Sequence, residues 1–86
     1  MPEISRFYGI IIYIYFNDHN PPHIHAYYND MQAIIGIKNN ALLKGKLPPK
    51  ALALITEWMI LNHKALLEDW ELASQLKPLK KIKPLE

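Results

Sequence analysis

Two consecutive prolines, Pro48 and Pro49, divide this 86-residue chain into two parts of different character. The 26 residues from 50 to 75 contain neither glycine nor proline, and residues of high helix propensity dominate them. Proline is well placed in the first turn of a helix. The sequence therefore predicts one long or bent C-terminal helix over about residues 48–75, roughly 40 Å long if it is straight. We expect a bend or a break at the polar segment 62–64.

Before the prolines, short runs of β-branched and aromatic residues alternate with Asn-Asp and Asn-Asn pairs. Such runs predict β-strands, and such pairs predict turns. The expected strands cover residues 9–16, 23–28, 32–40 and 41–47. The pattern predicts an α+β fold, with an antiparallel sheet of three to four strands within about residues 8–47 and the helix packed on one face. Residues 76–86 are a basic tail, and the whole chain, 1–86, is expected to be a single domain.

Alternation of side chains with period two predicts what each face of the sheet carries. One face should be apolar and lie under the helix, with Ile10, Ile12, Ile14, Phe16, Ile24, Ala26 and Tyr28. The other face should display tyrosine, histidine and lysine, namely Tyr13, Tyr15, His23, His25, Tyr27, Lys38, Lys44 and Lys46. Aromatic rings suit contact with unstacked bases, and lysines suit contact with phosphates.

Three of the four histidines, His19, His23 and His25, lie within seven residues and directly follow Asp18. These three imidazoles could hold a divalent metal such as zinc, with Asp18 as a further ligand or as the group that orients a ring. They could instead act as acid and base, as a metal-independent ribonuclease requires. The rings could also do no more than satisfy polar groups of a tight loop. The residues alone leave these three alternatives open.

The composition narrows the class of protein. A domain this small without cysteine favours a reducing cytoplasm, because small domains in oxidising compartments often use disulfides. The longest apolar run, 9–16, is far short of the about 20 residues that span a bilayer, so no membrane partner is expected. A net charge of +2 permits a nucleic-acid partner. The tail lysines, Lys80 and Lys81 among them, could contact phosphates, keep the tail solvated, or lie on a sheet edge.

The segments "FNDHNPPHIHAYY", "GKLPP", "LLEDWE" and "PLKKIKPLE" resemble the small bacterial domain of unknown function family 4160, and the similarity extends over essentially the whole chain. The resemblance implies a two-gene toxin–antitoxin module, in which this chain is the toxin and a small antitoxin-like protein from a neighbouring gene is its cognate partner. The matching positions are Asp18, His19, Pro21, Pro22, His23, His25, Trp58, Asp69, Trp70 and Glu71. Tyr27 departs from the family, since many relatives carry arginine or another polar residue there.

Together these features favour a toxin that cleaves RNA, with His23 and His25 as acid and base, and His19 and Asp18 orienting them. Two alternatives remain. One is a non-catalytic module that binds nucleic acid or protein, as a regulator or an antitoxin would. The other is a metal-binding hydrolase, in which His19, His23 and His25 would be the ligands. No other cofactor is expected, and a small core with an unpaired sheet edge also favours a homodimer.

Overall fold

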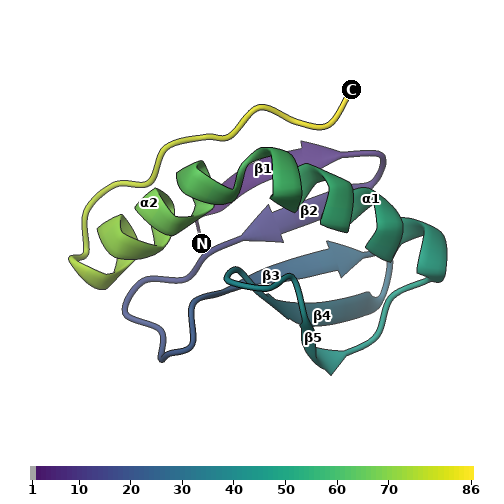
Figure 1. Ribbon diagram of the computed structural model, residues 1–86, viewed down its shortest axis with the longest axis horizontal. Coiled ribbons are helices and arrows are strands. Elements are labelled where there is room, and N and C mark those ends of the chain that lie inside the picture. Colours follow the sequence, from purple (N-terminus) through teal and green to yellow (C-terminus); the bar gives the residue numbers. More distant parts are fainter. Residues whose placement is uncertain (1) are drawn as a thin grey trace.

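The computed structural model describes residues 2–86, which form one antiparallel sheet with two helices across one of its faces (Figure 1). The strands are β1 Glu3–Phe7, β2 Ile10–Tyr13, β3 His23–Tyr28, β4 Met31–Gly36 and β5 Leu42–Gly45. They lie side by side in chain order, and the helices α1 Pro49–Leu61 and α2 His63–Ser74 follow them. The prediction of three to four strands and one long helix is therefore wrong, because the sheet has five strands and the helical segment forms two helices.

The strand that the sequence analysis misses is β1, which precedes the expected start of the sheet at residue 8. Its register against β2 shifts between Glu3 and Ser5, and Ser5 is buried, so its sequence lacks a clean alternation of polar and apolar residues. The turn to β2 uses Tyr8 and Gly9, both at positive φ (51° and 80°). Glycine suits such a two-residue hairpin turn, but tyrosine is a poor signal for one. Neither the strand β1 nor the turn after it therefore has a sequence pattern that predicts a hairpin.

The helical segment divides at Asn62, within the polar stretch 62–64. The described chain measures 33 × 26 × 23 Å, so a straight helix of roughly 40 Å would project beyond the sheet. The side chain of Asn62 donates a hydrogen bond from Nδ2 to the carbonyl oxygen of Trp58, at 2.8 Å. The carbonyl oxygen of Asn62 in turn accepts the amide of Leu66 in α2, at 2.9 Å. Asn62 thus supplies a hydrogen-bond donor to a carbonyl at the end of α1 and an acceptor to an amide in the first turn of α2.

The core lies between the helices and one face of the sheet. Its least exposed side chains are Ile10, Ile12, Ile14, Ile24, Ala26, Ile37, Ile55, Trp58, Met59 and Leu66. Trp58 packs on Phe7, with ring centroids 5.2 Å apart, and so joins α1 to β1. Phe16 was expected on this buried face, but β2 ends at Tyr13 and Phe16 is 44% exposed in the following loop.

The tail, residues 76–86, runs back beside the helices and along β1 (Figure 1, yellow). The amide of Ile82 donates to the carbonyl oxygen of Ile4 at 2.8 Å, and Nε1 of Trp58 donates to the carbonyl oxygen of Lys83 at 2.9 Å. The amide of Lys80 donates to the buried carboxylate of Asp69 at 2.9 Å, and burial raises the pKa of Asp69 despite that bond. The tail therefore partly covers one edge of the sheet. Within residues 2–86, neither helix is long and apolar enough to cross a membrane.

Candidate functional site

A histidine–carboxylate cluster forms where the loop between β2 and β3 returns to the sheet. Asn17 adopts a positive φ of 54°, which asparagine tolerates well, and its amide donates to the carbonyl oxygen of Ala73 at 3.1 Å. The turn directs Asp18 toward the start of β3. His23 and His25 are two residues apart on that strand and therefore point to the same side. A short loop and one strand thus supply every member of the cluster.

The ligand atoms of Asp18, His23 and His25 all lie within 4.8 Å of one another. Oδ2 of Asp18 is 2.9 Å from Nε2 of His23 and 3.2 Å from Nε2 of His25. Oδ1 of the same carboxylate accepts the backbone amide of His19 at 2.9 Å. The side chains of the three residues are only 8–18% exposed. Two histidines and one carboxylate are a ligand set that suits zinc in hydrolases and ferrous iron in oxygenases.

Both ring nitrogens of His23 face oxygen atoms. Nδ1 is 2.7 Å from the carbonyl oxygen of Pro21, which can only accept, so Nδ1 carries a hydrogen. Nε2 faces Oδ2 of Asp18, which is also an acceptor when the carboxylate is ionised. A neutral imidazole has only one N–H, so a second proton or a cation must lie between Nε2 and Oδ2. A bond from the remaining N–H to a backbone carbonyl is also how metal-binding histidines are oriented.

The surroundings favour an ionised Asp18 carboxylate and a neutral His25 ring. Burial acts to raise the pKa of Asp18, but hydrogen bonds from the His19 amide, His25 and His23 together hold that pKa below its usual value. Burial lowers the pKa of His25, and this outweighs the opposing effect of its hydrogen bond to Asp18. An anionic carboxylate beside an uncharged imidazole is the protonation state in which both groups act as metal ligands.

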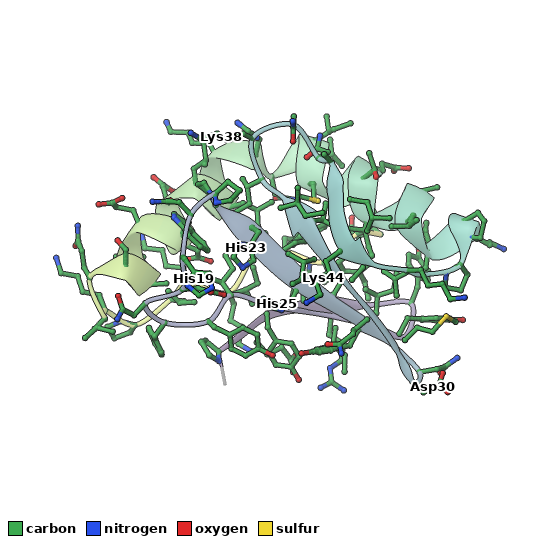
Figure 2. All side chains as sticks on the ribbon, turned by 90° about the horizontal axis from the view of Figure 1, so that it is seen from below. His19, His23, His25, Asp30, Lys38 and Lys44 are labelled. Atoms are coloured by element: carbon green, nitrogen blue, oxygen red, sulfur yellow. The ribbon has the colours of Figure 1, made fainter. Side chains whose placement is uncertain are left out.

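His19 does not join the cluster. Its side chain is 96% exposed, and its Nε2 lies 3.8 Å from Oδ1 of Asp18. Figure 2 shows His23 and His25 near the middle of the face and His19 on the adjoining loop. The contribution of His19 comes from its backbone amide, which orients Asp18. The structure therefore brings together Asp18, His23 and His25 rather than the three histidines that the spacing suggested.

The tyrosines form a packed group beside His25. The ring of Tyr15 stacks against Tyr13, with centroids 5.9 Å apart, and meets His25 edge-on at 4.4 Å. Tyr13 also meets Tyr27 edge-on at 5.2 Å. Tyr15 thus has two neighbouring rings, Tyr13 and His25, and its hydroxyl lies 2.8 Å from that of Tyr27. The predicted base contacts of Tyr13, Tyr15 and Tyr27 would therefore be polar contacts at ring edges more than stacking.

The lysines that were expected to bind nucleic acid separate into two groups. Strand register places His25, Ile34 and Lys44 in one row on the same face of β3, β4 and β5. Adjacent strands are about 4.8 Å apart, so the backbones of His25 and Lys44 are about 10 Å apart, within reach of a lysine side chain. Lys46, just beyond β5, does not line the hollows around His25. Lys80 and Lys81 belong to the tail, where the Lys80 amide donates to Asp69 of α2, and neither lysine lines these hollows.

Two shallow hollows occupy this face. The first, of about 370 Å³, is lined by Asp18, His19, His23, His25, Ile34 and Lys44 among others. The second, of about 260 Å³, shares His25, Ile34 and Lys44 and adds Tyr15, Tyr27 and Gln32. Ile34 and Gln32 were not among the site residues predicted from the sequence. Extending the alternation from Tyr27 through the turn at residues 29–30 would have placed both on this face, since Tyr27 pairs with Gln32 and His25 with Ile34.

Comparison with known proteins assigns the chain to a family but supplies no function. The model of the family "Domain of unknown function (DUF4160)" matches residues 9–71. The matched part includes β2 to β5, α1 and most of α2, and with them the cluster and both hollows. No curated protein and no solved structure matches the chain. The protein belongs to the family of domains of unknown function DUF4160.

Proposed function

We propose that this protein is a metal-assisted hydrolase that cleaves phosphodiester bonds of RNA, with Asp18, His23 and His25 as the metal ligands. The observation that carries the proposal is the pair of oxygen acceptors facing the two nitrogens of His23. A divalent cation held by the two rings and the carboxylate would take the place of the second proton at Nε2 and use all three ligand atoms together. Zinc fits this ligand set when the reaction is hydrolysis.

The reaction consumes water and breaks one phosphorus–oxygen ester bond. The water oxygen adds to phosphorus, and the leaving oxygen of the ribose takes up a proton. A bound divalent metal would supply positive charge to the phosphate and make the water a stronger nucleophile. The protein's own groups position these parts. The Pro21 carbonyl and the His19 amide fix the orientation of His23 and Asp18, and Lys44 contacts the phosphate from across the hollow.

Single-stranded RNA is the substrate that this surface suits. Both helices pack on the opposite face of the sheet, so neither of them covers this face and an RNA backbone can run across it (Figure 1). The tyrosine edges and Lys44 flank the cluster, where they can contact a splayed base and its phosphate. The charge of +2 does not oppose an anionic polymer.

A cleavage assay with a labelled single-stranded RNA tests the proposal. We expect purified protein to cut the RNA after addition of zinc or another divalent metal and to stop when EDTA is added. His25→Ala should lose the activity, and His19→Ala, which removes an exposed side chain outside the cluster, should keep it. The products would be separated on a denaturing gel. Cleavage that continues undiminished in EDTA would contradict the requirement for a metal. Intact RNA under every metal condition would contradict the proposed hydrolase activity.

At the level of the cell, the same proposal makes the protein a cytoplasmic toxin whose partner is a small antitoxin-like protein. Controlled expression in a bacterial host is expected to arrest growth and degrade RNA with the wild type. His25→Ala should be harmless at the same soluble level, because one metal ligand is lost. Growth and total RNA would be followed together. Harmless expression of both proteins would contradict the toxin role and favour a module that binds without chemistry.

A further inference from the structure

The smaller hollow beside the cluster has the features of a binding site for one base. Its residues Tyr15, Tyr27 and Gln32 are not part of the cluster, whereas His25 and Lys44 line both hollows. The two hollows therefore adjoin, with His25 and Lys44 at their boundary. A ligand in the smaller hollow would lie directly next to the proposed metal ligands.

The aromatic wall of this hollow can donate a hydrogen bond. The hydroxyl oxygens of Tyr15 and Tyr27 are 2.8 Å apart, so one hydroxyl donates to the other. The accepting hydroxyl keeps its own hydrogen, which is free for a ligand. Ile34 adds an apolar surface against which a planar ring can lie.

Gln32 and Lys44 supply the polar groups of the opposite side. Gln32 pairs directly with Tyr27 across β3 and β4, and its side chain is exposed. A primary amide offers one acceptor and two donors, the combination with which glutamine recognises the edge of a base. Lys44 lies in the adjoining row on β5 and offers a cation suited to phosphate. The hollow thus combines an aromatic wall, an amide and a cation at its border with the cluster.

We propose that this hollow binds a single nucleobase of the RNA, with Gln32 reading the edge of the base and Lys44 holding the adjoining phosphate. This inference rests on the proposed function, and it adds a residue that determines base preference. The hollow, at about 260 Å³, is smaller than the roughly 300–1,000 Å³ of sites for drug-sized ligands, which suits one base rather than a longer segment.

Titration of the four ribonucleoside 5′-monophosphates into ¹⁵N-labelled protein tests the inference, with each dissociation constant taken from amide shifts. We expect shifts at Gln32 and Lys44 and a preference of about 5-fold or more for one base, the lower end of what a good side-chain contact to a base provides. Gln32→Ala should reduce that preference to within about 2-fold, because the amide that distinguishes the bases is gone. Lys44→Ala should weaken all four nucleotides about 10-fold alike, since a charged contact to phosphate is lost.

Two features of the chain act as controls. Lys81→Ala removes a cation of the tail beside Ile82, which bonds to β1, the edge strand opposite β5; Lys81 lines neither hollow, so all four constants should stay unchanged. A separate hollow of about 430 Å³, lined by Tyr8, Tyr28 and Lys50 among others, shares no residue with the proposed site. Shifts confined to that hollow would overturn the inference, as would a base preference that survives Gln32→Ala. Because Gln32 is exposed, its loss should leave the spectrum of the folded protein intact.

The same proteins would be assayed for RNA cleavage, so that the two proposals can fail separately. If the protein bound nucleotides in this hollow but cleaved no RNA, the result would support the inference and contradict the proposed hydrolase function. Cleavage by a protein whose hollow binds none of the four nucleotides would overturn the inference and leave the hydrolase in place.

Discussion

Asp18→Ala is expected to weaken zinc binding by more than 100-fold and to abolish RNA cleavage. Loss of an outer partner of a metal ligand already costs about 10–100-fold in affinity, and Asp18 would be a ligand itself. The variant also leaves the two imidazoles of His23 and His25 without the anion that both of them face. Zinc affinity would be measured by isothermal titration calorimetry, which reports binding even if no substrate is known.

His19→Ala is the matched control for Asp18→Ala. The two residues are adjacent, and both belong to the motif that the sequence offers as a site. Removing the exposed imidazole of His19 keeps the backbone amide that donates to Oδ1 of Asp18, so zinc affinity should stay within about 2-fold of the wild type. An equal loss in the two variants would show that the imidazole of His19 is a ligand as well. If both variants kept the zinc affinity of the wild type, the proposed metal site at this loop would be wrong.

The sequence predicted four of the five strands and missed β1. Runs rich in β-branched and aromatic residues indicated β2 and β3, and the runs at 32–40 and 41–47 contain most of β4 and all of β5, but β2 and β4 end earlier than expected, at Tyr13 and Gly36. β1 was missed because a register shift and a buried serine interrupt its pattern. The number of helices depended on tertiary dimensions, since the size of the sheet limits how far a straight helix can extend.

Which residues form the site was only partly predictable, because their positions depend on a loop path and on the pairing of strands. Period two places His23 and His25 on one side of a strand wherever that strand lies. Whether Asp18 or His19 approaches them depends on the path of a loop through Pro21 and Pro22, and spacing alone does not determine that path. Lys44 could be placed beside His25 only after the order and register of β3, β4 and β5 were known. Contacts across a sheet join residues far apart in the sequence, so the sequence of one strand alone does not predict them.

Trp58→Ala is expected to destabilise the protein by about 3–5 kcal/mol, the range for removing a buried tryptophan side chain. A chain of 86 residues has roughly 4–13 kcal/mol of total stability, so this loss would remove a large share of it and, at the lower end of the range, unfold the protein. Trp58 is fully buried, packs on Phe7 of β1, and donates to the carbonyl oxygen of Lys83 in the tail. One side chain thus joins the first strand, the first helix and the tail. Urea denaturation followed by circular dichroism would measure the loss.

Two further variants separate the causes of that loss. Ile60→Ala changes a side chain on the same helix that is 62% exposed, and it should alter the free energy of unfolding by no more than about 0.5 kcal/mol. Trp58→Phe keeps an aromatic ring in the core but leaves the carbonyl oxygen of Lys83 without its donor, so it should cost about 1–3 kcal/mol. If Trp58→Ala proved no more harmful than Ile60→Ala, the tryptophan would not join these elements. If Trp58→Phe were as harmful as Trp58→Ala, the bond to the tail, rather than the packing of the ring, would provide most of the stability.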